Sequence, residues 1–141
     1  LFVPVRSLDA VRRARIRLDL WERVLSSYWA REIFIFTFER ERQGSDLHAR
    51  MFAPGLGIGE DPATGAAATA LAGYLGSRDA REDGTLRWVV EQGFEMGRPS
   101  IMAIEADKQG GAIVAIRVGG AAVAVSSSEM TVPDRVPPEV A

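Results

Sequence analysis

The 141-residue sequence contains no cysteine and a single histidine, His48. Without thiols the chain can form no disulfide, no thiolate nucleophile and no cysteine-based metal site, and one histidine cannot supply a multi-histidine site. The absence of cysteine fits a cytoplasmic protein, because structural disulfides belong to oxidising compartments. We therefore expect no metal centre in this chain.

Long apolar runs and a surplus of positive charge are also missing. No stretch is apolar for long enough to cross a bilayer, and no charged-then-apolar leader opens the sequence. The formal net charge of −2 offers no overall basic field to nucleic acid or to an anionic membrane. The arginine-rich run over residues 12–17 is flanked by acidic residues, which favours a solvated helix surface. We expect neither nucleic acid nor a membrane as a partner.

What is present is the composition of an ordinary globular domain, with 47% hydrophobic and 26% charged residues. No internal repeat or linker divides residues 1–141, so we expect a single domain. The sequence opens at Leu1, within a strand-like run over residues 1–5, which predicts a piece of a longer protein. Residues 131–141 contain three prolines and are predicted to form a surface tail.

Apolar periodicity divides the first half of the chain into strands and helices. Strands are predicted over residues 1–5, 32–39 and 47–52, the second of them rich in β-branched and aromatic side chains. Ser7 is expected to cap a helix over residues 8–16, and Asp19 to cap a second helix. In that second helix an apolar stripe at helical spacing comprises Trp21, Val24, Leu25 and Tyr28.

The second half begins with a glycine-rich stretch over residues 53–59, predicted as a loop, and a helix over residues 63–75 that ends at Gly76. Four strands are expected after it, and glycine pairs separate the last three at hairpin spacing. These strands are predicted over residues 86–92, 99–106, 112–118 and 121–125. The order of elements indicates an α+β fold with a mostly antiparallel sheet.

The helix predicted over residues 63–75 is small and apolar on nearly every side. A helix without a polar face should be buried on most of its circumference, and a sheet wrapped round it would bury it. Its first turn leaves backbone N–H groups without intrahelical partners, and such donors attract anions. We therefore predict a small-molecule carboxylate site at residues 61–67.

Two starts are compatible with this helix. Asp61 can be the N-cap, with Pro62 at the first helical position, or Thr64 can be the N-cap, so that the unpaired donors extend to Ala67. Gly65 has no side chain, so a ligand can approach the backbone closely there. From spacing alone, an ordinary acidic N-cap and a glycine packing contact are the favoured interpretation.

Three other features of the sequence are candidates for a binding or catalytic role. The glycine-rich run over residues 55–59 lacks both the dinucleotide pattern and the lysine-bearing ending of a phosphate loop, which favours a flexible loop. His48 is expected to make a structural hydrogen bond from a strand, because no nucleophile motif accompanies it. Arg98 can pair a substrate carboxylate, although a surface or structural ion pair is the more frequent use of such an arginine.

Several motifs, in order along the chain, together resemble the phenazine-biosynthesis PhzF-like family. They are Arg50-Met51-Phe52-Ala53-Pro54, Glu60-Asp61-Pro62-Ala63-Thr64-Gly65-Ala66-Ala67, Glu91-Gln92-Gly93, Met96-Gly97-Arg98-Pro99-Ser100 and Val118-Gly119-Gly120. The resemblance implies a diaminopimelate-epimerase-like fold of two half-domains, each with a curved sheet round a central helix. The sequence resembles the C-terminal half. An N-terminal half-domain is then missing from it.

The resemblance also implies an activity and a set of site residues. Family members include an isomerase of a dihydro-hydroxyanthranilate that acts without a cofactor. Asp61 matches the motif aspartate that assists substrate binding or proton transfer, and residues 64–67 (Thr64, Gly65, Ala66 and Ala67) match the substrate-binding helix start. Ala66 stands where the family often has serine, so one hydroxyl donor is lost. The family's general-base glutamate has no match here, and Glu60 is not assigned to that role.

These observations lead to one main hypothesis and two alternatives. The main hypothesis is the C-terminal half of a cofactor-independent isomerase that moves a proton on a small carboxylate-bearing metabolite, with the chain inactive by itself. The first alternative is a non-catalytic small-molecule binding or assembly module of the same fold. The second is a homodimer formed through strand edges and an apolar face.

Overall fold

The computed structural model describes residues 1–131, and their strands form one seven-stranded sheet. Residues 132–141 of the predicted tail lie outside the described residues. The elements are β1 (Phe2–Pro4), α1 (Leu8–Arg13), α2 (Leu18–Val24), β2 (Ile33–Thr37), β3 (Leu47–Ala53), η1 (Pro54–Leu56), β4 (Ile58–Asp61), α3 (Gly65–Gly76), β5 (Gly84–Gln92), η2 (Phe94–Met96), β6 (Ser100–Gln109) and β7 (Ala112–Gly120).

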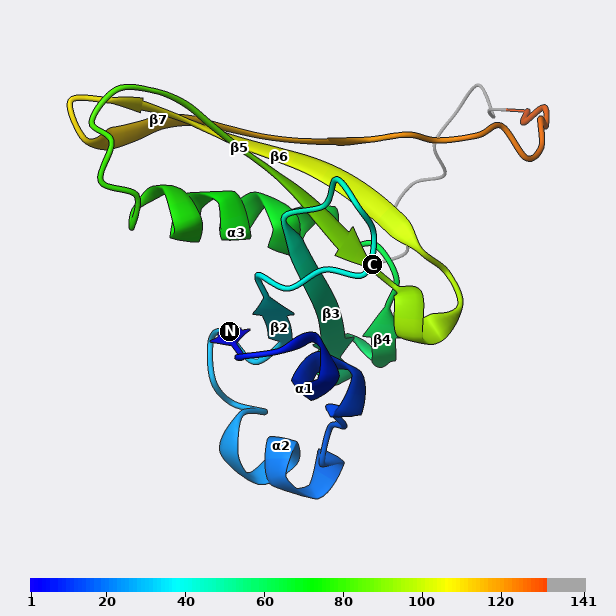
Figure 1. Ribbon diagram of the computed structural model, residues 1–141. Helices are drawn as coiled ribbons and strands as arrows, with labels where there is room; N and C mark the ends of the chain where they lie inside the picture. The colour runs from blue at the N-terminus through cyan, green and yellow to red at the C-terminus, as the bar shows by residue number, and fades with distance from the viewer. Residues whose placement is uncertain (132–141) are drawn as a thin grey trace, which may run out of the picture.

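The sheet is curved and open, and its strand order is β1-β2-β3-β5-β6-β7, with β4 paired to β3 (Figure 1). Four neighbouring pairs are antiparallel, and the pairs β1–β2 and β3–β5 are parallel. The expected α+β class with a mostly antiparallel sheet is therefore confirmed. Pro4 ends the edge strand β1, a position where a missing N–H costs no ladder bond.

Helix α3 lies against the concave face of the sheet, beneath β5, β6 and β7 (Figure 1). One face of the helix is buried, through Ala68, Leu71, Ala72, Leu75 and Gly76. The opposite face is not covered, because Ala66 and Ala70 are exposed. The other residues of the helix are buried or half-buried, so the expected burial round most of the circumference is seen only in part within residues 1–131.

Close packing joins α3 to the sheet at its C-terminal end. A Cβ on Gly76 would lie 3.1 Å from Ala106 Cβ, and one on Gly73 would lie 3.1 Å from Ile116 Cδ1. The helix ends at Gly76 as predicted, although Gly76 is its last helical residue without a positive φ and Ser77 is the C-cap. The glycines instead let the helix approach the strands closely. This contact fixes the direction in which the first turn of α3 points.

The helices of the first half differ from expectation in length and capping. Ser7 caps α1 as predicted, with its Oγ accepting from Ala10 N at 3.2 Å, but the helix ends at Arg13. Helix α2 has Arg17 rather than Asp19 at its N-cap, and Tyr28 lies beyond its end. Asp19 is drawn into an ion pair with Arg17, and its carboxylate no longer caps the helix.

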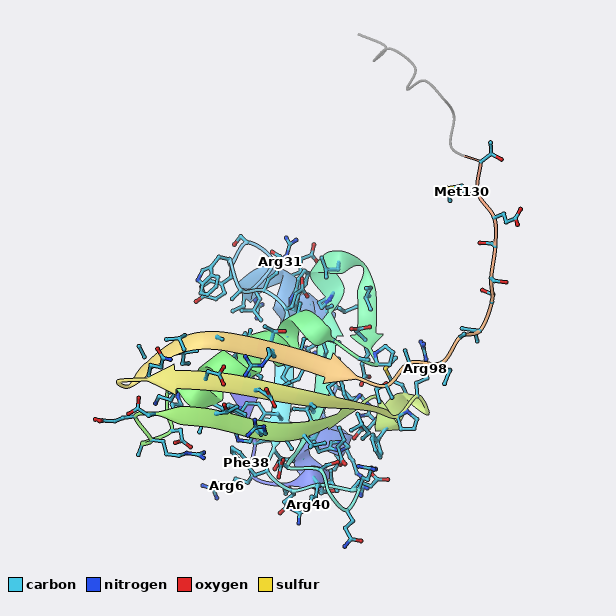
Figure 2. The ribbon with its side chains drawn as sticks, turned by 90° about the horizontal axis from the view of Figure 1, so that it is seen from above. Arg6, Arg31, Phe38, Arg40, Arg98 and Met130 are labelled. Carbon is cyan, nitrogen blue, oxygen red and sulfur yellow. The ribbon has the colours of Figure 1, made fainter. Side chains whose placement is uncertain are left out.

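Two segments differ from the prediction: a segment expected as loop and turn forms a strand, and a segment expected as a strand forms none. Residues 58–61 form β4, because Met51 and Ala53 of β3 offer backbone partners to Asp61 and Ile58. Residues 121–125 form no strand, since β7 already runs through the glycine pair at 119–120 to complete its ladder with β6. After β7 the chain leaves the sheet, as Figure 2 shows for the segment that carries Met130.

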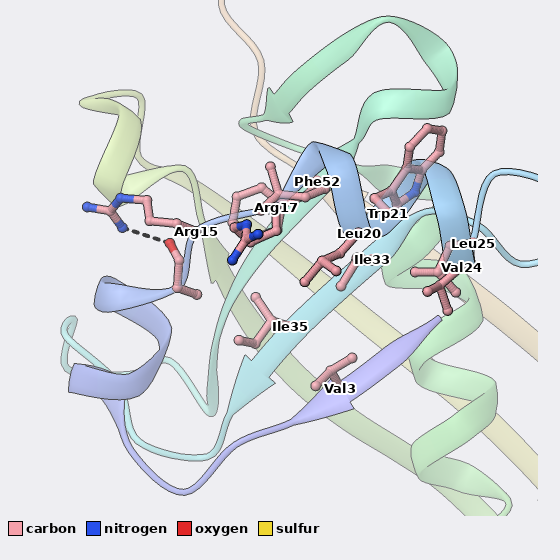
Figure 3. Close-up of a pocket in the computed structure, with 12 residues that line it drawn as sticks. Val3, Arg15, Arg17, Leu20, Trp21, Val24, Leu25, Ile33, Ile35 and Phe52 are labelled. Carbon is pink, nitrogen blue, oxygen red and sulfur yellow. Dashed lines mark hydrogen bonds between the residues drawn. The ribbon is translucent and has the colours of Figure 1, made fainter.

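A hollow lies beneath α2, on the outer face of β1 and β2 (Figure 3). It measures about 380 Å³, and apolar side chains such as Trp21, Ile33 and Phe52 form most of its lining. The two arginines at its rim, Arg15 and Arg17, already bond backbone carbonyls and Asp19. The hollow therefore offers packing space without a free polar group of its own.

No helix among residues 1–131 is both long enough and apolar enough to cross a membrane.

Candidate active site at the start of helix α3

The first turn of α3 carries three amide donors without an acceptor. Thr64 is the N-cap, and the first intrahelical bond is donated by Ala68 N to Thr64 O at 2.9 Å. Within residues 1–131 the N–H groups of Gly65, Ala66 and Ala67 have no acceptor. The later of the two starts allowed by the sequence is therefore confirmed, and its donors stay available to an anion.

Thr64 itself is engaged on both of its polar groups. Its backbone N donates to Gln92 Oε1 at 3.3 Å, which removes this N–H from the donors expected at residues 64–67. Its Oγ1 donates to Asp61 Oδ2 at 2.5 Å instead of capping the helix. The predicted anion-binding set is thereby reduced to three consecutive amides at residues 65–67.

Asp61 is the last residue of β4 and is not the helix N-cap that spacing alone favoured. Its partner in the ladder is Met51 of β3, which places the carboxylate three residues before the helix. The strand ends here because Pro62 cannot donate to a ladder. Asp61 therefore lies beside the start of α3, held by the Thr64 hydroxyl rather than by helix amides.

A cavity of about 580 Å³ adjoins this helix start, between α3, the beginning of β6 and the end of β7. We call it the β6–β7 cavity. Its lining is Ala63, Gly65, Pro99, Ser100, Ile101, Met102, Val118, Gly119, Gly120 and Ala121. Of the sequence-predicted site residues, only Gly65 is among them. Asp61, Thr64 and Ala66 are not in the lining, and Ala67 borders a second groove instead.

The second groove lies on the uncovered side of α3 and measures about 640 Å³. Aromatic and aliphatic side chains form it, including Trp29, Leu56 and Tyr74. Trp29 is 87% exposed and Leu56 is 65% exposed, so this groove is open to solvent. The start of α3 thus lies between a small-residue cavity and an apolar groove.

Arg98 lies in the segment that connects η2 to β6 (Figure 2). Its side chain is exposed and has no ion-pair partner in the part of the chain that the structure describes. Its backbone is fixed, since Arg98 N donates to Gly93 O at 2.9 Å and Ser100 Oγ donates to Arg98 O at 3.3 Å. The expected surface ion pair is absent there, and a role toward a substrate carboxylate stays a prediction.

His48 is fully buried on β3 between two carboxylates. Its Nδ1 lies 2.7 Å from Glu91 Oε1, and its Nε2 lies 2.8 Å from Glu95 Oε1. Although burial opposes the charged ring, these hydrogen bonds raise the pKa of His48 above its usual value. Two ring nitrogens that both face carboxylates indicate an imidazolium that donates twice. The expectation of a structural histidine is confirmed.

The two glutamates are stabilised in their charged form by the same contacts. Burial would raise the pKa of Glu91, but the Glu41 backbone N–H and the His48 ring lower it below its ordinary value. Burial likewise opposes ionisation of Glu95, and the hydrogen bond from His48 lowers the pKa of that carboxyl. The three side chains therefore form a buried group of compensating charges, in which the Glu95 Oε2 atom has no hydrogen-bond partner within residues 1–131.

Arg50 and Glu60 extend this polar group. The Arg50 Nε and Nη2 atoms each lie 2.8 Å from a Glu60 carboxylate oxygen, and Nη1 donates to Val11 O and Ala14 O. The hydrogen bonds that Arg50 donates to Glu60 raise the pKa of Arg50. Both Glu60 oxygens are occupied, which agrees with not assigning Glu60 as the base. We call His48, Arg50, Glu60, Glu91 and Glu95 the His48 cluster.

The arginine-rich run over residues 12–17 behaves as expected for a solvated surface. Arg12 pairs with Glu41, Arg13 with Asp9 and Arg17 with Asp19, all on exposed side chains.

Within residues 1–131 no group of three or more histidine, aspartate and glutamate side chains could hold a metal ion.

Comparison with known proteins places this chain in a family. The family model described as "Phenazine biosynthesis-like protein" matches residues 1–128, and the chain belongs to that family. An uncharacterized isomerase of Mesorhizobium japonicum is 39% identical over 131 residues, which cover 91% of this chain and 43% of that protein. A trans-2,3-dihydro-3-hydroxyanthranilate isomerase of Pseudomonas fluorescens is 34% identical over 85% of this chain and 40% of its own length.

A solved structure agrees with the sequence relatives. The crystal structure of the Bacillus anthracis phenazine biosynthesis protein of the PhzF family matches 75% of this chain with a TM-score of 0.65 and 25% sequence identity. The match covers 36% of that chain. The chain therefore spans less than half the length of the relatives it matches. The resemblance stated from the motifs is confirmed.

Proposed function

We propose that this chain is the C-terminal half of a cofactor-independent isomerase that binds a small carboxylate-bearing metabolite at the start of α3. The observation that carries the proposal is the row of three amides, at residues 65–67, without an acceptor within residues 1–131. Fixed donors of this kind at an oxyanion site contribute about 3–4 kcal/mol each. The family relatives that carry the name isomerase support this assignment.

The reaction proposed is a proton shift that needs no redox change. A base removes a C–H proton next to a carbonyl or carboxylate, and the electron pair left behind is delocalised onto the oxygen. The amides of residues 65–67 hold that oxygen, and the proton returns at another carbon. Asp61, placed beside the amides and held by Thr64, assists substrate binding or proton transfer.

The base is proposed to come from a second half-domain, so that the complete enzyme has a diaminopimelate-epimerase-like fold with its site between the halves. Within the His48 cluster both carboxylate oxygens of Glu60 and of Glu91 accept hydrogen bonds, which argues against either of them as the base. Glu95 is bonded to His48 through Oε1, and its buried Oε2 has no hydrogen-bond partner among the described residues. The apolar groove beside α3 provides a surface that a second half-domain would cover. Val123 and Val125, 84% and 93% exposed, extend the uncovered apolar surface. A cytoplasmic location fits the absence of cysteine.

A chimera tests the activity. The part of the Mesorhizobium relative that this chain does not match is joined to residues 1–141, and the product is incubated in heavy water with trans-2,3-dihydro-3-hydroxyanthranilate. We expect deuterium to enter the substrate in the chimera, to be absent with the chain alone, and to be lost after Asp61→Ala. Undiminished exchange in the Asp61→Ala chimera would show that Asp61 has no catalytic role.

A non-catalytic binding module is the second candidate, and the hydrogen-bonded carboxylates of Glu60 and Glu91 favour it, because neither has an oxygen without a partner. This candidate predicts that a carboxylate binds at residues 65–67 while the chimera exchanges no deuterium. Light scattering on the isolated chain examines the homodimer, which would cover the groove at Trp29 and Leu56 with a second copy. A monomer at high concentration excludes it.

A further inference from the structure

Gln92 is fully buried at the end of β5, and all its polar atoms are used by the turn before α3. Its Nε2 donates to Asp61 O at 2.6 Å and to Thr64 Oγ1 at 3.0 Å, and its Oε1 accepts from Thr64 N at 3.3 Å. We propose that Gln92 is a positioning residue that fixes the direction of the Thr64 hydroxyl and so presents Asp61 and the amides of residues 65–67 to an anion. This inference rests on the proposed function.

The orientation of the Gln92 amide is dictated by the backbone of the turn. A reversed amide would place its oxygen against the carbonyl of Asp61 and its NH₂ group against the N–H of Thr64. Both contacts would be repulsive, and a buried polar group left without its partner costs about 1–3 kcal/mol. The backbone of residues 61–64 therefore determines which end of the amide meets the Thr64 hydroxyl.

The direction of the Thr64 hydroxyl follows from that orientation. Its oxygen accepts a proton from Gln92 Nε2, so its own proton is directed to Asp61 Oδ2. Asp61 is thereby held at one carboxylate oxygen. Within residues 1–131 no donor contacts its other oxygen, which stays available to a substrate. A carboxylate in place of the Gln92 amide would accept a hydrogen bond from the Thr64 hydroxyl. The hydroxyl proton would then no longer be directed to Asp61.

The strand end that carries Gln92 cannot slide away from the turn. Gln92 pairs with Ser100 of β6 and with Ala49 of β3, which fixes its register in the sheet. The next residue, Gly93, has φ +82°, and a Cβ there would lie 2.4 Å from Arg98 O and 2.7 Å from Pro62 O. This close approach holds the Pro62 backbone against β5. The same strand end therefore connects the sheet, the helix start and the Arg98 segment.

Two substitutions abolish the hydrogen bond from the Thr64 hydroxyl to Asp61 while keeping the shape of the substituted side chain. Gln92→Glu keeps the shape of the side chain, but the new carboxylate accepts a hydrogen bond from the Thr64 hydroxyl and repels the carbonyl oxygen of Asp61. Because a buried charge there can unfold the chain, Thr64→Val serves as the second variant, since it keeps the N–H to Gln92 and the β-branched shape. Thr64→Ser restores a hydroxyl. The matched controls are Thr85→Val, which removes a hydroxyl bonded to Asp107 elsewhere, and Gln109→Glu at an exposed position.

The readout is a titration of the ¹⁵N-labelled chain with benzoate, a stable aromatic carboxylate, followed at the amides of residues 65–67. Thr64→Val and, if folded, Gln92→Glu should weaken benzoate binding at least tenfold. Thr64→Ser and both controls should keep the native affinity. The two Gln92 side-chain amide protons give a separate signature: in Thr64→Val one of them should move upfield as it loses its acceptor.

The outcomes separate the inference from the proposed function. If native benzoate binding persists in Thr64→Val, the direction of the hydroxyl does not matter and Gln92 has no positioning role. The same conclusion follows if Thr64→Ser fails to bind although it is folded. If the unsubstituted chain shows no saturable shift at residues 65–67, the carboxylate site is overturned, and the inference is overturned with it.

Discussion

The His48 cluster and the start of α3 contact adjacent residues at the end of β5, Glu91 and Gln92, whose side chains point to opposite faces of the sheet. The two regions treat polar groups in opposite ways. In the cluster, buried charges are matched by partners: His48 contacts two carboxylates, and Arg50 bonds both oxygens of Glu60. At the helix start, three amides have no acceptor within residues 1–131. Within residues 1–131 the Glu95 Oε2 atom is the one buried oxygen of the cluster without a hydrogen bond. The difference teaches that pairing of charges serves the fold, whereas unpaired donors leave room for a ligand.

The largest expected effect comes from breaking the paired region. His48→Phe keeps the ring volume but leaves Glu91 and Glu95 without their shared partner, which should cost about 3–5 kcal/mol of unfolding free energy. Urea unfolding followed by circular dichroism measures the loss. Arg13→Ala, which removes an exposed helix pair, is the control and should leave the midpoint unchanged. Loss of less than about 1 kcal/mol in His48→Phe would mean that the cluster is no better than a surface pair.

The next effect concerns the junction between the two regions. Gly93→Ala introduces a Cβ into a left-handed residue and against two carbonyl oxygens, whereas Gly57→Ala, at φ +73°, meets nothing within 4 Å. Both substitutions carry left-handed strain of about 1–2 kcal/mol. Overpacking should make Gly93→Ala about 1–3 kcal/mol worse than Gly57→Ala. Equal unfolding midpoints would contradict the close contact between β5 and Pro62.

The pH dependence of stability sharpens the comparison, because the His48 cluster contains side chains whose pKa values are shifted by their contacts. The pKa of His48 is raised above 6.5, so its contribution is full below pH 6.5 and is lost as the pH rises through the folded value. The pKa values of Glu91 and Glu95 are lowered below 4.5, so their contribution is present above pH 4.5 and is lost on further acidification.

The urea midpoint should therefore be highest between about pH 4.5 and 6.5 and should fall on either side. His48→Phe should lose the fall above pH 6.5, which identifies the titrating group. A midpoint that rises steadily from pH 6 to 9 in the unsubstituted chain would contradict a charged His48.

The smallest effect concerns the open region. Ala66→Ser adds a hydroxyl to an exposed position of the first turn, the position where the family resemblance implies a serine. One additional hydrogen bond of about 1 kcal/mol should tighten benzoate binding several-fold. Stability should change little, because Ala66 packs against no core side chain. Ala70→Ser, one turn further along the exposed face, is the control and should leave benzoate affinity unchanged.

Much of the fold could be predicted from local patterns. The strand at 33–37 and the helix at 65–76 follow from β-branched and alanine-rich runs, whose periodicity is independent of distant contacts. Strand β4 could not be predicted from local patterns, because Gly59, Glu60 and Asp61 have little strand preference and its structure depends on pairing with β3. The strand expected at 121–125 failed because residues 119–120, which signal a turn, continue β7 instead.

The site was predictable in part. The run of small apolar residues predicted the helix and left two possible N-caps, Asp61 and Thr64. The sequence could not decide between them, because Asp61 is drawn into β4 by its pairing with Met51, a contact between strands. The role of Gln92 was missed, because its contacts lie 28 and 31 residues away in sequence. The Glu91-Gln92-Gly93 motif was the available signal. Its family resemblance was noted, but spacing alone cannot show which side chain faces the turn.

A crystal structure of the chain with benzoate tests the central claim most directly. The account predicts carboxylate oxygens within about 2.7–3.2 Å of the backbone nitrogens at residues 65–67. Benzoate bound in the hollow beneath α2 or in the groove at Trp29, with these three amides left unoccupied, would contradict it.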